Sequence, residues 1–222
     1  MELKPHFYSF DELEYNVRHL YGSLRRSSEN IYNLVDNEIN EKGIYKPKIG
    51  SIVFTEKQKE FESFQEILRN LNNFIYFNSL LLGSYSIFEV TIKDICIFVD
   101  EFSNPKFEFE EPKRSIIKNC RKFLKDSKLV DFSNNLIDAK YTNILKIGKV
   151  RNLIAHKNGN IIQDKTKLIE QQTNYKLFKS MKYLTILQNG QVYINDEELL
   201  KDFIKDSEIF ISLIIKDLKH TR

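Results

Sequence analysis

The stretch RNLIAH, residues 151–156, combines three side chains that can act on an anionic substrate. Asn152 and His156 are four residues apart, so a helix would place both on one face. Arg151 lies about 140° from His156 around such a helix, and its long side chain can close part of that gap near a helix end. Gly159 predicts that end, where the helix dipole favours a protonated imidazole. The spacing therefore predicts that a cation, an amide and a titratable ring share one half-exposed edge.

Cleavage of a phosphodiester bond in RNA is the chemistry that this set favours. A histidine with a pKa near neutral can remove or deliver a proton. An arginine can bind the phosphate and offset the charge that develops on it. The 2′-hydroxyl of RNA can be the nucleophile and leave a 2′,3′-cyclic phosphate, so no protein nucleophile, metal or cofactor is required. The same spacing also arises in helices where both residues only support structure, and spacing alone does not separate the two interpretations.

Other common catalytic patterns are missing from the sequence. There is no glycine-rich phosphate loop, no GxSxG nucleophile motif and no HExxH metal motif. The other histidines, at positions 6, 19 and 220, are scattered singly, which is typical of surface or packing residues. Cys96 and Cys120 lack CxxC spacing, which favours buried free thiols in a reducing compartment. We therefore expect no metal site.

Positive charge is concentrated in one part of the chain. Residues 113–157 contain 12 Lys and Arg against 3 Asp, a local net charge of +9, whereas the whole chain carries +3. The remaining residues must therefore sum to −6. Such asymmetry is typical of a surface that binds a polyanion, although a solvated helix surface without a partner has the same composition.

Long helices are expected because glycine and proline are scarce, at seven and four residues. A capping box of Ser9 and Glu12 predicts the start of the first helix. Apolar residues at helical spacing predict a second helical stretch over about 55–102, with a bend or break at Asn72–Asn73 or Gly83. A loop precedes it, marked by Gly43, Pro47 and Gly50. The sequence then predicts a second loop, a short basic helix after Pro112 with Ile116, Ile117, Cys120 and Leu124 facing inward, and a helix over about 141–157.

The pattern changes near the C-terminal end. The run YLTILQNGQVYIN favours strands on both sides of Asn189-Gly190, which predicts a hairpin over about 181–194. Asn195 is expected to cap a last helix. The fold class is therefore mostly α, a helical bundle with a small β-hairpin insertion. We expect one domain over 1–222, with 1–54 as an N-terminal helical extension and 55–222 as the core. Without a leader or a membrane-length apolar run, a cytoplasmic location is expected.

The motif and its surroundings resemble the HEPN superfamily. RNLIAH looks like the R-x4-6-H signature of that family, including the polar residue that often follows the arginine. The segment LLLGSYSIFEVTIKDI resembles its first core helix, which is often rich in aromatic residues and carries a glutamate. The resemblance spans roughly residues 76–218. It implies a helical bundle that dimerises through the motif helix, so that two motifs form one composite site.

Family membership would imply a metal-independent endoribonuclease, the toxin of a toxin–antitoxin or phage-defence system. Arg151 would then bind the scissile phosphate, His156 would act in proton transfer, and Asn152 would orient His156 or the backbone. Glu89 and Ser84 are further candidates, although a surface salt bridge explains Glu89 equally well and the adjacent Tyr85 is expected in the core. A neutralising antitoxin, either an inhibitor or a nucleotidyltransferase, would be expected. The alternative is a non-catalytic HEPN-like module that binds RNA or protein.

The resemblance gives the basic region a candidate role in RNA binding. Four basic residues recur at helical spacing and could follow an RNA backbone, and three more lie nearer the motif. The first group comprises Arg114, Lys118, Lys122 and Lys125, and the second comprises Lys146, Lys149 and Lys157. RNA is thus the expected partner, and neither DNA nor a membrane is expected. A plain solvated face remains the other interpretation.

Overall fold

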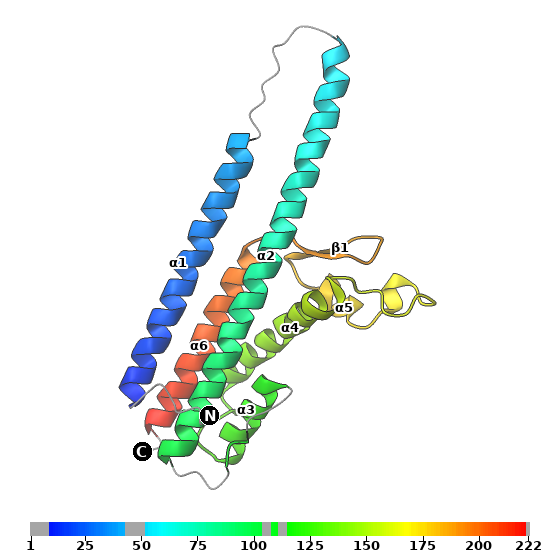
Figure 1. Cartoon of the computed structure of the whole chain (residues 1–222). Helices are drawn as coiled ribbons and strands as arrows, with labels where there is room; N and C mark the ends of the chain where they lie inside the picture. Colours follow the sequence, from blue (N-terminus) through cyan, green and yellow to red (C-terminus); the bar gives the residue numbers. More distant parts are fainter. Residues whose placement is uncertain (1–8, 43–51, 104–107, 111–114, 221–222) are drawn as a thin grey trace.

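The computed structural model describes residues 9–42, 52–103, 108–110 and 115–220 (Figure 1). The chain is mostly helical, with one small antiparallel hairpin before the last helix, as the sequence predicts. The predicted loop at Gly43, Pro47 and Gly50, the proline at position 112 and Arg114 lie outside these residues. In chain order the elements are α1 (Phe10–Lys42), α2 (Ile52–Ser103), α3 (Ile116–Asp126), α4 (Asn135–Lys157), the 3₁₀ turn η1 (Ile169–Gln171), α5 (Tyr175–Lys179), β1 (Leu184–Ile186), β2 (Val192–Ile194) and α6 (Glu198–His220).

Helices α1, α2 and α6 lie side by side, and α4 packs across α6 and α2 (Figure 1). The short helix α3 packs on the C-terminal part of α2. The hairpin and α5 lie beyond the C-terminal end of α4. This arrangement brings residues of α2, which are early in the chain, against the motif helix α4.

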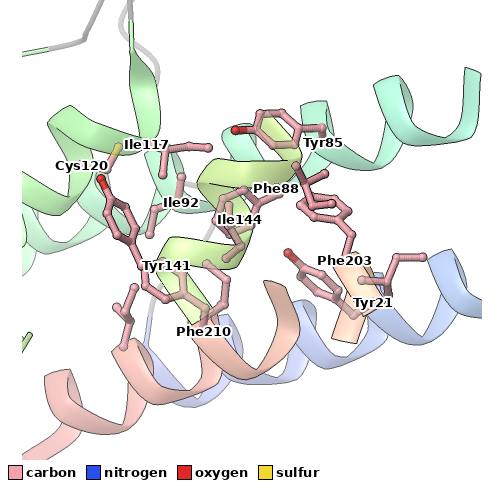
Figure 2. Close-up of a cluster of buried hydrophobic side chains, with 14 of the residues drawn as sticks. Tyr21, Tyr85, Phe88, Ile92, Ile117, Cys120, Tyr141, Ile144, Phe203 and Phe210 are labelled. Carbon is pink, nitrogen blue, oxygen red and sulfur yellow. The ribbon is translucent and has the colours of Figure 1, made fainter. Parts of the chain in front are cut away.

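The core is rich in aromatic side chains at the point where these helices meet (Figure 2). Phe88 of α2 and Phe203 of α6 are fully buried and pack edge to face, with ring centroids 6.2 Å apart. Such buried aromatic pairs stabilise a core beyond the area that they bury. Tyr21 of α1 is buried in the same core. The segment 1–54, expected as a helical extension, therefore contributes the first half of α1 to this core.

Helix α2 is continuous through both places where a bend or break was predicted, so the expectation of a break is wrong. Gly83 lies on the exposed side of the helix, and a methyl group added there would meet nothing within 4 Å. A single glycine in a helix costs only about 1 kcal/mol relative to alanine. Burial of the flanking residues Leu81 and Tyr85 stabilises the helix on both sides of Gly83.

Helix α4 begins earlier than predicted, at Asn135 rather than near Tyr141. The side chain of Asn134 accepts a hydrogen bond from the N–H of Leu136 and thereby caps the helix. The predicted C-terminal end is confirmed at Lys157. Asn158 and Gly159 then adopt left-handed backbone conformations, with φ of 48° and 74°. The N–H of Gly159 donates to the carbonyl of Leu153, so the turn satisfies a helix-end acceptor.

The predicted hairpin is confirmed. Strands β1 and β2 pair in antiparallel register, with Thr185 opposite Tyr193, and Gly190 in the turn has a φ of 81°. Asn195 does not cap α6, contrary to expectation. The Asp196 carboxylate accepts from the N–H of Glu198, whereas the Asn195 amide donates to the Thr185 hydroxyl.

The two cysteines are buried free thiols, as predicted. The Cys96 thiol lies 3.9 Å from the Cys120 carbonyl oxygen, and burial raises the pKa of Cys96 well above its ordinary value. Of the four α3 residues predicted to face inward, Ile117, Cys120 and Leu124 are buried, and Ile116 is partly buried against the core. In the described part of the chain, no helix has an apolar stretch long enough to cross a membrane.

Candidate functional site

The RNLIAH motif occupies the last turns of α4. Leu153 and Ile154 are buried, whereas Asn152 and His156 are exposed and Arg151 is half-buried. The two apolar residues anchor the helix to the core and leave the polar residues on the open side. The half-exposed edge predicted from helical spacing is therefore present.

Arg151 is held by three neighbours. Its Nη2 lies 3.5 Å from the Glu89 carboxylate on α2, and its Nη1 donates to the Asn152 side-chain oxygen at 3.1 Å. Its guanidinium carbon lies 5.6 Å from the centre of the Tyr85 ring, within the range of a cation–π interaction. Asn152 thus orients Arg151. The buried Nε of Arg151 has no hydrogen-bond partner among the described residues.

Glu89 is a half-buried carboxylate. Burial raises the pKa of Glu89 above its ordinary value, and the nearby Arg151 cation opposes that shift. The burial effect is the larger one because the ion pair is long and both partners remain partly solvated. A negative ligand that bound Arg151 would compete directly with Glu89 for the guanidinium group.

Tyr85 is a buried residue that lines this site. Tyr85 is 5% exposed, and its ring stacks on Phe203 of α6, with ring centroids 5.4 Å apart. Its hydroxyl lies directly against the backbone of Gly148 on α4, where a methyl group would overlap the hydroxyl oxygen. Burial raises the pKa of Tyr85, so the phenol stays neutral. Gly148 therefore permits the close approach of α2 and α4 that places the Tyr85 ring near Arg151.

A surface groove of about 970 Å³ is lined by the motif residues and by part of the predicted basic surface. Three basic side chains, from α3 and α4, line it beside Arg151, Asn152 and His156. The named lining residues include Tyr85, Glu89, Lys118, Lys146, Lys149 and Leu177. We call this the motif groove. Its volume lies within the range of ligand-binding pockets, and its charge suits an anionic ligand.

The other predicted residues do not line the motif groove. Lys122 and Lys125 are exposed on α3, and Lys157 is exposed at the end of α4. Ser84 is 2% exposed, and its hydroxyl has no hydrogen-bond partner among the described residues. Because it is buried, Ser84 supports the helix packing and does not reach the groove.

Sequence reasoning missed the role of Gly148 and assigned Tyr85 only to the core. The available signal was a glycine in the middle of a predicted helix, three residues before the arginine of the motif, since such a glycine often marks a close packing contact. Leu177 of α5 was also missed. It reaches the groove through a segment that the sequence pattern leaves unassigned.

Among the described residues, no three His, Cys, Asp or Glu side chains gather in a way that could hold a metal ion. Comparisons of the chain with protein-family models, with curated proteins and with solved structures find no match.

Proposed function

We propose that this chain is an endoribonuclease that cleaves RNA without a metal ion, acting as a HEPN-like toxin or defence effector. One observation carries the proposal: Arg151, Asn152 and His156 open into the same groove as Lys118, Lys146 and Lys149. An arginine, a titratable ring and three further cations are groups that suit phosphodiester cleavage. The sequence resemblance to HEPN domains supports the same reaction.

In the proposed reaction, the RNA phosphate lies between Arg151 and the lysines. The 2′-oxygen attacks phosphorus, the bond from phosphorus to the 5′-oxygen breaks, and a 2′,3′-cyclic phosphate forms. A base removes the proton from the 2′-hydroxyl, and an acid delivers a proton to the departing 5′-oxygen. His156 serves one of these roles. Arg151 offsets the charge on the non-bridging oxygens.

A homodimer would complete this site. One chain supplies a single His156, whereas the reaction uses both an acid and a base. A two-fold contact centred on the exposed end of α4 would bring two motifs together. Two Arg151 side chains would then need an anion between them, which the scissile phosphate supplies. A protein antitoxin would neutralise such an enzyme by covering the groove or by modifying it.

Catalysis is tested by replacing His156 or Arg151 with alanine. Each change should reduce cleavage of RNA by about 10²–10⁴-fold, the usual contribution of an acid–base group, while circular dichroism shows an intact fold. Lys165, an exposed residue outside the motif groove, provides a control as Lys165→Ala, which should cleave normally. Cleavage should persist in EDTA. Unchanged cleavage by both folded motif variants would refute the proposal, and loss of cleavage in EDTA would refute its metal-free form.

The dimer is tested by mixing. Inactive Arg151→Ala and inactive His156→Ala chains should regain part of the activity as heterodimers if the Arg151 of one chain works with the His156 of the other. Sedimentation of the active protein should show a dimer at micromolar concentration. A strictly monomeric chain that still cleaves RNA would show that each chain has its own site.

A non-catalytic binding module is the second candidate, and the contacts of Arg151 favour it. The side chain is already engaged by Glu89, Asn152 and Tyr85, as a structural arginine would be. This alternative predicts that the protein binds RNA or a protein partner without cutting RNA. It also predicts that Arg151→Ala lowers the free energy of unfolding while His156→Ala does not.

A further inference from the structure

A second groove lies beside the motif groove and shares one lysine with it. Its volume is about 410 Å³. It is lined by residues of α4 and α6 and by the segment 181–183, which leads into the hairpin. Lys146 of α4 lines both grooves. The two grooves therefore meet at Lys146, on the surface of the helix that carries the motif.

Some of the charge in the second groove is already paired. The Lys140 ammonium lies 2.5 Å from the Asp206 carboxylate, and the Asn143 amide donates to the other oxygen of Asp206 at 2.9 Å. These contacts fix Asp206 in place and neutralise it. Among the described lining residues, the charges that remain are those of lysines 146, 182 and 205 and of one carboxylate, Asp202.

The three lysines outnumber Asp202, so this groove keeps a net positive charge. Burial raises the pKa of Asp202, and the nearby Asp206 and Glu198 carboxylates add to the shift. A bound anion would raise that pKa further and make protonation of Asp202 easier. The second groove is thus a cationic surface that can accept a phosphate.

An aromatic ring lies at the same groove. Tyr183 is half-buried, and the exposed Lys182 places its ammonium 4.9 Å from the centre of the Tyr183 ring and 3.4 Å from its hydroxyl. An aromatic face beside mobile lysines is how proteins bind single-stranded nucleic acid, because bases stack on the ring while cations contact the backbone. A base could stack on Tyr183 while Lys182 turns to an adjacent phosphate.

We propose that the second groove binds the stretch of single-stranded RNA that adjoins the segment in the motif groove. The inference rests on the proposed function, since it takes RNA as the ligand. The strand crosses α4 at Lys146, with Tyr183 stacking a base and Lys182 and Lys205 contacting phosphates. A path that passes over a helix from one groove to another requires a flexible strand, which favours single-stranded over duplex RNA. A volume of about 410 Å³ suits a short segment of the strand.

The test compares short and long RNA probes on the full chain. The probes are 2′-O-methyl oligouridylates, which lack the nucleophile and are not cut: a trinucleotide and an oligomer of about twelve nucleotides, within the site sizes of single-strand binders. Lys182→Glu/Lys205→Glu should weaken binding of the long probe and leave the trinucleotide unaffected. Loss of two phosphate contacts should flatten the log–log salt dependence for the long probe by roughly 1.4.

Lys165→Glu/Lys216→Glu is the matched control, because it makes the same charge change at exposed positions outside both grooves. If this control weakens binding equally, net charge alone explains the effect, and the inference is overturned. So would a groove variant that binds the long probe as tightly as the unmodified chain. If the unmodified chain binds neither probe, the proposed function fails first and the second groove fails with it.

Stacking is tested with 2-aminopurine placed in the long probe outside the trinucleotide segment. The unmodified chain should quench its fluorescence through Tyr183, and Tyr183→Phe should preserve the quenching because the ring remains. Tyr183→Ala should abolish it, with thermal unfolding used to confirm that the variant is folded. Quenching that survives in the folded alanine variant would show that the base does not lie on Tyr183.

Discussion

Replacement of Gly148 by alanine tests the contact on which the geometry of the motif groove depends. The added methyl group would overlap the Tyr85 hydroxyl oxygen and lie 3.0 Å and 3.4 Å from two ring carbons. Ordinary carbon contacts are about 3.5–4.0 Å. The ring cannot move away easily, because it is buried and stacks on Phe203. We therefore expect Tyr85 or the two helices to shift.

The expected change in the free energy of unfolding follows from two opposing effects. Overpacking of a core typically destabilises by about 1–3 kcal/mol. Alanine gains about 0.8–1.0 kcal/mol over glycine in a helix interior. Gly148→Ala should therefore lower the free energy of unfolding by about 1 kcal/mol. Urea denaturation followed by far-ultraviolet circular dichroism measures this change.

Gly83→Ala is the matched control, because its methyl group would meet nothing within 4 Å. It should raise the free energy of unfolding by about 0.5–1 kcal/mol, so the same substitution should have opposite signs at the two glycines. Adding Tyr85→Phe to Gly148→Ala removes the overlapping oxygen and should recover part of the loss, as a double-mutant cycle would show. Gly148→Ala that stabilises as much as Gly83→Ala would refute this account of the helix contact.

Three further predictions concern the motif groove, Glu89 and the segment 163–172. Lys118→Glu/Lys149→Glu should weaken binding of single-stranded RNA and lower its log–log salt slope by roughly 1.4, whereas Lys122→Glu/Lys125→Glu, outside the groove, should change the slope little; equal slopes for both pairs would contradict the assignment. The pKa of Glu89 is raised in the folded state, so its contribution to stability is present at low pH and is lost as pH rises through that folded pKa. Glu89→Gln should therefore gain stability relative to the unmodified chain between the ordinary glutamate pKa and neutral pH, as denaturation at both pH values will show, and a constant difference would contradict the burial argument. The buried Gln172 amide accepts from the N–H groups of Gln163 and Asp164 and donates to the carbonyls of Asp164 and Lys167. Gln172→Ala should lower the free energy of unfolding by roughly 1–3 kcal/mol and speed hydrogen exchange at both N–H groups, and unchanged exchange there would mean that Gln172 does not hold the loop.

The sequence predicted the elements better than the contacts between them. Apolar spacing located the helices because buried faces recur at the helical period. It placed the start of α4 too late because Asn134, which reads as a loop residue, is the cap of the helix. It also predicted a bend or break in α2 at Asn72–Asn73 or Gly83, since composition alone does not show that the residues beside Gly83 are buried strongly enough to keep the helix intact.

The candidate site shows the same contrast between predictable elements and unpredictable contacts. The motif residues could be identified from the sequence because they lie on one short segment. The pairing of Arg151 with Glu89 joins residues 62 positions apart, and the Tyr85 contact depends on how closely α2 approaches α4. Both depend on helix crossing, which local spacing does not determine. Of the predicted basic residues within the described chain, Lys118, Lys146 and Lys149 lie in the motif groove for the same reason: the packing of α3 beside α4 selects them.

The packing of α1 against α6 bears on the order in which the motif groove assembles during synthesis. Lys219 of α6 pairs with Asp11 and Glu14 of α1, and Phe203 of α6 backs the Tyr85 ring. A nascent chain that has emerged only as far as the RNLIAH motif lacks this support, and its first helix lacks its contacts with α6. Contacts between such distant segments form late because a long loop must close first. Translation past α6 is therefore a prerequisite for a complete groove, and a stalled ribosome would carry the motif without an assembled site.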